Sequence, residues 1–103
     1  MSALYRKKVG PLLKRLANPA SYGENLMQLS EDAEQAGMVA DRAGAIEALT
    51  VLLTHKSAVV REGAIYGLTP HLEYYVEQLR QMSEQDPSPG IRDAAAEALE
   101  VLK

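Results

Sequence analysis

The sequence predicts an all-α protein, a short α-solenoid of about five or six helices, and three observations lead to this fold class. Apolar residues recur at three- and four-residue steps over most of the chain, which is the spacing of one helix face. No stretch shows sustained apolar–polar alternation with β-branched residues, so no strand is expected. A pattern about thirty residues long also occurs twice, which is typical of stacked helical repeats.

Four helices are expected in the C-terminal part of the chain. The first covers residues 42–54, and a polar turn separates it from a second helix at 58–68. Pro70 cannot extend that helix but suits the first position of a new one, which predicts a third helix at 70–84. A turn rich in Pro and Gly ends the third helix, and a fourth covers residues 89–102.

The N-terminal third has a less regular pattern. Gly10-Pro11 interrupts a run of leucines, so we expect a short turn followed by a helix that begins near Pro11. Residues 18–21 read as a loop. A further apolar helix face starts at Leu26, and Gly37 is expected to limit it.

The internal repeat sets the expected domain organisation. Residues 60–68 match residues 91–99 at an offset of 31, and Leu68 and Leu99 would fill the seam between helix layers. A single two-helix unit cannot bury its apolar face, so roughly three units must stack. We therefore expect one domain over residues 1–103, made of a degenerate N-terminal capping unit at 1–41 and repeats at 42–69 and 70–103.

The last repeat carries a family resemblance. Residues 86–92 read Asp-Pro-Ser-Pro-Gly-Ile-Arg and are followed by Ala95 and Ala98-Leu99. This pattern resembles the HEAT repeat, and most closely the short HEAT-like repeats of the phycobilisome-lyase type. The resemblance implies a right-handed HEAT-like superhelix with a scaffold, adaptor or regulatory role.

The same resemblance implies a ladder of side chains between neighbouring repeats. In the family, an Asp in the turn within a repeat and an Arg early in the second helix form this ladder. Asp86 and Arg92 would be the ladder pair of the last repeat. Arg61 matches the Arg of the middle repeat, where His55 stands in place of the usual Asp. The three residues Arg61, Asp86 and Arg92 are thus expected to have a structural role.

Composition excludes several kinds of chemistry. The 103 residues include no Cys, which excludes disulfides, a thiol nucleophile, iron–sulfur clusters and Cys-based zinc sites. His55 and His71 are the only histidines, and neither has the spacing of a catalytic or metal site. We expect no catalytic residue, metal or cofactor, and a protein that is not an enzyme. No apolar run could span a membrane and no signal peptide is recognisable, so a cytoplasmic protein is expected.

Two exposed helix stripes form the candidate protein-binding surface. Glu62, Tyr66 and Thr69 share one side of the helix at 58–68, and tyrosine is a frequent anchor at interface centres. By the resemblance, second helices line the concave side, so this stripe would face a groove. The acidity of the groove favours a basic or polar protein partner over nucleic acid. The corresponding stripe of the last helix consists of Asp93, Glu97 and Glu100.

Two alternative functions stay open, and the first of them rests on an uneven distribution of charge. Residues 1–21 carry a net charge of +5, whereas the remainder carries −8. Nucleic-acid binding through this basic segment is the first alternative, with phosphate contacts and base stacking. An accessory role resembling that of bilin lyases is the second, and self-association through the last helix also stays open. The possible nucleic-acid contacts are Tyr5, Arg6, Lys7, Lys8, Lys14 and Arg15.

Overall fold

The computed structural model describes the backbone of residues 3–102 and the side chains of residues 9–102, and the regular secondary structure of this part is helical. Within residues 3–102 no strand is present, which confirms the expected all-α fold. Two 3₁₀ helices, η1 (Pro19–Tyr22) and η2 (Thr69–Tyr74), interrupt the series of α-helices. The α-helices are α1 (Ala3–Leu16), α2 (Leu26–Val39), α3 (Arg42–Leu52), α4 (Ala58–Gly67), α5 (Val76–Gln85) and α6 (Pro89–Val101).

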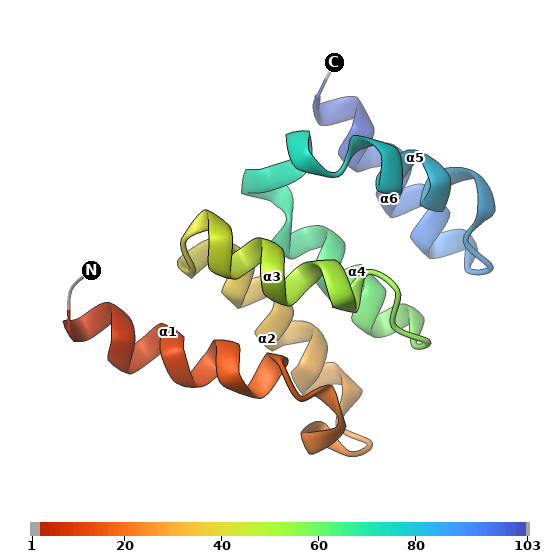
Figure 1. Cartoon of the computed structure of the whole chain (residues 1–103). Helices are drawn as coiled ribbons and strands as arrows, with labels where there is room; N and C mark the ends of the chain where they lie inside the picture. The colour runs from red at the N-terminus through yellow and green to blue at the C-terminus, as the bar shows by residue number, and fades with distance from the viewer. Residues whose placement is uncertain (1–2, 103) are drawn as a thin grey trace.

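The helices form two layers. Helices α1, α3 and α5 lie on one side of the molecule and α2, α4 and α6 on the other, with the two ends of the chain at opposite ends (Figure 1). The Cα atoms span 41 × 32 × 15 Å with a radius of gyration of 13.2 Å. A compact domain of 100 residues has a radius of gyration of about 13 Å, so the assembly is a compact globule.

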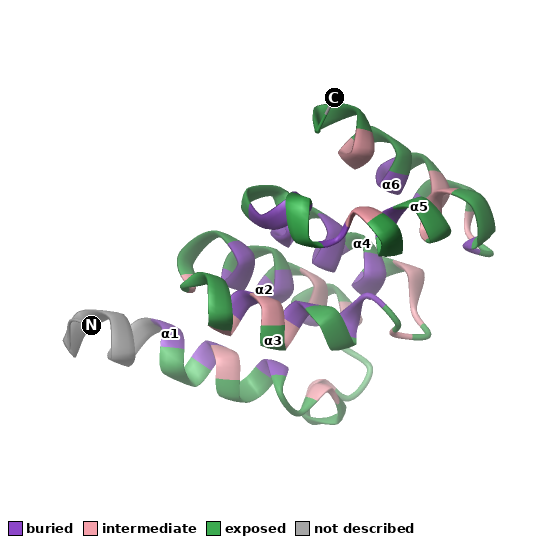
Figure 2. Ribbon diagram, turned by 45° about the horizontal axis from the view of Figure 1, so that its top comes forward, coloured by how far each residue is buried: buried purple, intermediate pink, exposed green. Residues whose placement is uncertain are grey.

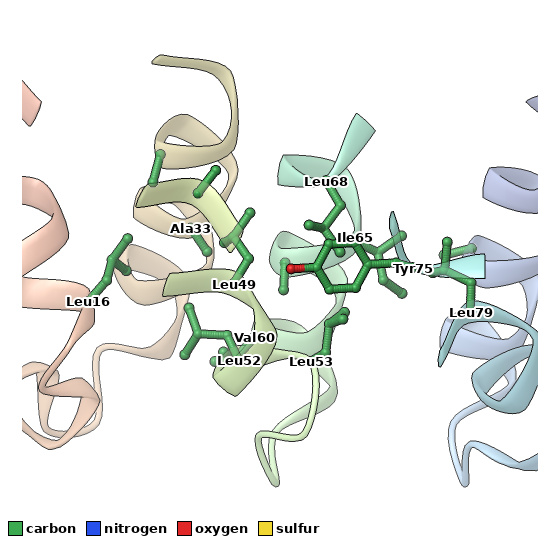
Figure 3. Packing of buried hydrophobic residues seen from close by; sticks show 14 of the residues in the cluster. Leu16, Ala33, Leu49, Leu52, Leu53, Val60, Ile65, Leu68, Tyr75 and Leu79 are labelled. Carbon is green, nitrogen blue, oxygen red and sulfur yellow. The ribbon is translucent and has the colours of Figure 1, made fainter. Parts of the chain in front are cut away.

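One hydrophobic core runs through both layers. Buried residues occupy the faces on which helices meet, while the outward faces are exposed (Figure 2). Leu49 and Leu52 of α3 point into the same cluster as Ile65 and Leu68 at the end of α4 (Figure 3). The cluster is continuous from Leu12 to Ala95, so apolar burial links the N-terminal third to the last helix.

The turn expected at Gly10-Pro11 does not form, because α1 passes straight through Pro11. A proline inside a helix costs about 3 kcal/mol, since it removes a hydrogen bond. Gly10 and Pro11 are exposed, whereas Val9, Leu12 and Leu16 on the other side are at most 4% exposed. Burial of each large aliphatic side chain contributes about 1.5–3 kcal/mol, which outweighs the local cost.

The helix expected at 70–84 is divided into η2 and α5. Pro70 lies in the first turn of η2, and Tyr75 interrupts the helical backbone with φ −128° and ψ 18°. The ring of Tyr75 is buried against the core, and its hydroxyl shares a 2.6 Å hydrogen bond with the hydroxyl of Thr50. The burial of this ring and the hydrogen bond of its hydroxyl stabilise the bend between η2 and α5.

Helices α2 and α4 approach closely because glycines lie where they cross. Gly37 does not limit α2 as expected, since the helix continues to Val39. A Cβ atom on Gly37 would collide with the carbonyl of Gly67. A Cβ on Gly67 would lie 2.6 Å from the carbonyl oxygen of Ala33, and a Cβ on Gly63 would collide with Ser30. These glycines therefore set the position of α4 relative to α2.

Candidate protein-binding groove

An open apolar groove of about 160 Å³ lies between α4, η2 and α6. We call it the Tyr66 groove. Its floor consists of the buried side chains of Ile65, Leu72 and Ala94. Its walls and end are formed by Tyr66, Thr69, Glu97, Ala98 and Val101. Three helices thus expose part of the core beside a small number of polar side chains, which is the usual make-up of a binding site.

Tyr66 stands in an acidic environment. Its side chain is 43% exposed, although it lines the groove. Burial raises the pKa of the Tyr66 hydroxyl above its ordinary value, and the negative charges of Glu62, Glu97 and Glu34 raise the pKa further. These three glutamates come from three different helices, so the fold gathers negative charge around one aromatic ring.

Glu34 of α2 is the member of this site that the sequence did not predict. It lies near Tyr66 because the glycines of α4 bring α2 close. The spacing of Gly63 and Gly67, four residues apart on one face of α4, is the sequence signal that could have indicated this approach.

The structure brings together four of the six residues predicted to bind a partner. Tyr66, Thr69 and Glu97 line the groove, and Glu62 lies one turn before Tyr66 on α4. The Thr69 hydroxyl donates a 2.7 Å hydrogen bond to the Tyr66 carbonyl, so Thr69 is fixed at the end of α4.

The other two predicted residues lie outside the Tyr66 groove. Asp93 is exposed one turn before Glu97 on α6 and does not line the groove. Glu100 lines a separate groove between α5 and α6, together with Val76, Arg80, Ala96, Leu99 and Leu102. The stripe predicted from the sequence is therefore split between two faces of α6.

Arg61, Asp86 and Arg92 form a network beside the core. The Arg61 guanidinium donates to both carboxylate oxygens of Asp86, from Nε and Nη2, at 2.9 Å each. Arg92 donates to the Asp86 carbonyl at 2.7 Å. Asp86 and Arg92, the expected ladder pair of the last repeat, are thus joined through the Asp86 carbonyl, while the carboxylate of Asp86 pairs with Arg61. This network joins the start of α4 to the turn between α5 and α6.

Both histidine rings contact backbone groups. Nδ1 of His55 accepts a 3.0 Å hydrogen bond from the backbone N–H of Ser57. His71 is buried in η2, with Nε2 3.1 Å from the Gly37 carbonyl oxygen. Both rings therefore contact the backbone of a turn or helix end.

The predicted nucleic-acid contacts are described only in part. The side chains of Tyr5, Arg6, Lys7 and Lys8 lie outside the described residues. Lys14 is exposed, and Arg15 is exposed with Nε 3.7 Å from a carboxylate oxygen of Asp32. Asp32 also accepts hydrogen bonds from Tyr22 and Gln28. Asp32 therefore holds η1 and the end of α1 against α2.

The described residues contain neither a membrane-spanning helix nor a cluster of metal-binding side chains. No helix within residues 3–102 has the length and apolar character needed to cross a membrane. Over the same stretch of chain, His, Asp and Glu side chains form no cluster that could hold a metal ion. In comparisons with known proteins, no family model, curated protein or solved structure matches the chain.

Proposed function

We propose that this protein is a non-catalytic protein-binding module that holds its partner in the Tyr66 groove. The observation that carries this proposal is the position of Tyr66, an aromatic side chain 43% exposed on the wall of an apolar groove. Tyrosine is enriched among the residues that dominate the binding energy of protein interfaces. Val101, which is 70% exposed at the end of the groove, adds apolar area that a partner can bury.

The size of the groove favours a polypeptide partner over a small molecule. Pockets for drug-sized ligands and cofactors occupy about 300–1,000 Å³. The Tyr66 groove has about 160 Å³ and is partly open to solvent. A volume of this size suits one inserted side chain, with the remaining contacts made by the surrounding surface.

We further infer that helices α3–α6 form two stacked HEAT-like repeats in a right-handed solenoid, with α1 and α2 as a capping unit. Equivalent hydrogen bonds support this architecture at an offset of 31 residues. In each repeat an Arg donates to the carbonyl six residues before it, and that same residue accepts from the backbone N–H two residues after it. The bonds are Arg61 to the His55 carbonyl (2.8 Å), Arg92 to the Asp86 carbonyl (2.7 Å), Ser57 to His55 (3.0 Å) and Ser88 to Asp86 (2.9 Å).

The experiment that tests this proposal is affinity capture from the native lysate, with and without nuclease, followed by mass spectrometry. We expect a stoichiometric protein that survives nuclease and is lost with Tyr66→Ala. The matched control is Tyr74→Ala, because Tyr74 is 49% exposed, lies outside the groove and contacts Arg42 of α3. Capture that is unaffected by Tyr66→Ala would contradict the proposal.

The same experiment decides the first alternative. Lys14 and Arg15 are exposed and the N-terminal segment is basic, which favours contact with phosphates. Capture that disappears with nuclease and with Lys14→Glu, but persists with Tyr66→Ala, would assign the binding function to nucleic acid.

A further inference from the structure

We propose that the partner segment bound in the Tyr66 groove is a cationic polypeptide, with one large apolar side chain inserted in the groove and Lys or Arg beside it. This inference rests on the protein-binding function proposed above. It specifies the chemistry of the partner from the volume of the groove and from the charges around it.

The volume of the groove suits a single anchor. An apolar cavity of about 150 Å³ accommodates a benzene molecule, and the Tyr66 groove has about 160 Å³. Its floor of Ile65, Leu72 and Ala94 is apolar and almost fully buried, so it offers no polar partner to an inserted group. A leucine or phenylalanine side chain therefore matches the floor, whereas a charged group would lose its hydration there.

The surroundings of the groove require positive charge on the partner. Glu97 lines the groove, and Glu62 lies one turn before Tyr66 on α4. The Cα atom of Glu34 lies 3.2 Å from the position that a Cβ atom would take on Gly67, the residue after Tyr66, and all three carboxylates act on the Tyr66 hydroxyl. Within the described part of the chain, none of these three carboxylates forms an ion pair. A cation placed beside them would gain attraction that increases as the interface excludes water.

The protein does not supply this positive charge from the same helices. Helix α2 contains no Lys or Arg, and α4 and α6 contain one Arg each. Those two residues, Arg61 and Arg92, both bind Asp86 at the far end of their helices. The negative charge around the groove is therefore available to attract a positively charged partner. The same charge repels phosphate, so the groove disfavours nucleic acid.

The test uses a defined peptide as the probe. The probe is a synthetic helix of about 15 alanine and lysine residues with one central leucine. One comparison peptide replaces the leucine with alanine, and another replaces every lysine with glutamate. Binding is followed by the backbone amide shifts of the isotope-labelled protein, which report both the affinity and the residues contacted.

We expect the leucine–lysine peptide to shift the amides of Tyr66, Thr69 and Ala98. Each comparison peptide should bind at least about tenfold more weakly, which corresponds to a loss of about 1.4 kcal/mol in binding free energy. Equal binding of the glutamate peptide, or shifts confined to another face, would overturn the inference.

Matched protein variants separate charge and shape from general effects. Glu62→Lys with Glu97→Lys should weaken binding of the probe at least about tenfold. Glu24→Lys with Glu84→Lys gives the same net charge on exposed positions outside the groove and should change binding less than about twofold. Ala98→Leu fills the Tyr66 groove and should block binding of the probe. Ala96 lines the separate groove between α5 and α6, so Ala96→Leu should leave binding unchanged.

Failure of this inference is distinguishable from failure of the proposed function. If Tyr66→Ala abolishes capture of the native partner while the Glu62→Lys, Glu97→Lys variant retains it, the groove binds protein and the cationic class is wrong. If Tyr66→Ala leaves capture unchanged, both proposals are wrong. Thermal unfolding of each variant shows that a loss of binding does not come from loss of the fold.

Discussion

The Arg61 guanidinium pairs with the Asp86 carboxylate through two parallel hydrogen bonds of 2.9 Å, although 25 residues separate them in the chain. Both side chains are almost fully buried, at 11% and 6% exposed. The fork of an arginine matches a carboxylate in this geometry and holds the two groups in one orientation. The pair therefore connects the start of α4 with the turn that precedes α6, and it supports one end of the helices that carry the Tyr66 groove.

Removing one partner of this pair should be strongly destabilising. Asp86→Ala leaves the Arg61 charge buried without its counter-ion, and we expect a loss of about 3–5 kcal/mol in the free energy of unfolding. Urea denaturation followed by circular dichroism measures this loss. The control is Glu77→Ala, which breaks an exposed pair with Arg80 and should cost less than about 1 kcal/mol. Equal losses for the two variants would contradict a structural role for Asp86.

Leu68 and Leu99 should differ in their contribution to stability. Leu68 is fully buried in the core, so Leu68→Ala should cost about 2–5 kcal/mol. Leu99 is only half-buried and lines the groove between α5 and α6, so Leu99→Ala should cost less than that range. Chemical denaturation of both variants tests the difference, and a larger loss at Leu99 would mean that α6 packs differently.

Gly67→Ala should destabilise the protein even though alanine favours helices. In a helix interior alanine is better than glycine by about 1 kcal/mol, but a Cβ on Gly67 would lie 2.6 Å from the Ala33 carbonyl oxygen. Forcing α2 and α4 apart should cost about 1–3 kcal/mol. Gly90→Ala is the control, because its Cβ would meet only the Ser88 hydroxyl at an ordinary 3.8 Å. Thermal unfolding should show a lower midpoint for Gly67→Ala only.

Stability should fall at high pH through Tyr22. Burial raises the pKa of Tyr22 from 10.0 to about 12, and its 2.6 Å hydrogen bond to Asp32 adds to the shift. The fold thus prefers the neutral phenol, while the unfolded chain loses this proton near pH 10. The stabilisation is complete below pH 10 and is lost as the pH rises to about 12. Denaturation at several alkaline pH values should show this fall, and Tyr22→Phe should make it shallower.

Neutralising the acidic side chains should lower the pKa of Tyr66. Glu62 and Glu97 both raise it, so the variant with Glu62→Gln and Glu97→Gln should ionise its Tyr66 hydroxyl at a lower pH. Ultraviolet titration of phenolate, with Tyr66→Phe to identify the signal, measures the change. An unchanged titration would place the two carboxylates farther from the ring than the structure does.

The sequence pattern predicted the C-terminal helices well because their apolar spacing and turn residues agree. Residues 42–54, 58–68 and 89–102 were expected as helices, and α3, α4 and α6 lie within one or two residues of them. The prediction of a turn at Pro11 was wrong, because the burial of one face of α1 outweighs the cost of a proline inside a helix. The division at Tyr75 also depends on tertiary contacts, since its hydroxyl bonds to α3.

The sequence predicted the residues of the candidate site that lie together on one helix, but not those that another helix brings to it. Glu62 and Tyr66 are one turn apart on α4, and the sequence places them on one side of that helix. Glu34 joins them through the approach of α2, which no local pattern shows. Glu100 was assigned to the same stripe because it lies one turn beyond Glu97, but the partners of α6 differ on its two sides.

The most direct test of the central claim, that the Tyr66 groove holds a protein partner, is site-specific photo-cross-linking. A benzophenone amino acid replaces Thr69, which is exposed at the groove, or Glu84, which is exposed on α5 outside it. We expect a cross-linked partner with the benzophenone at position 69 and none with it at position 84. A partner that cross-links only from position 84 would contradict this claim.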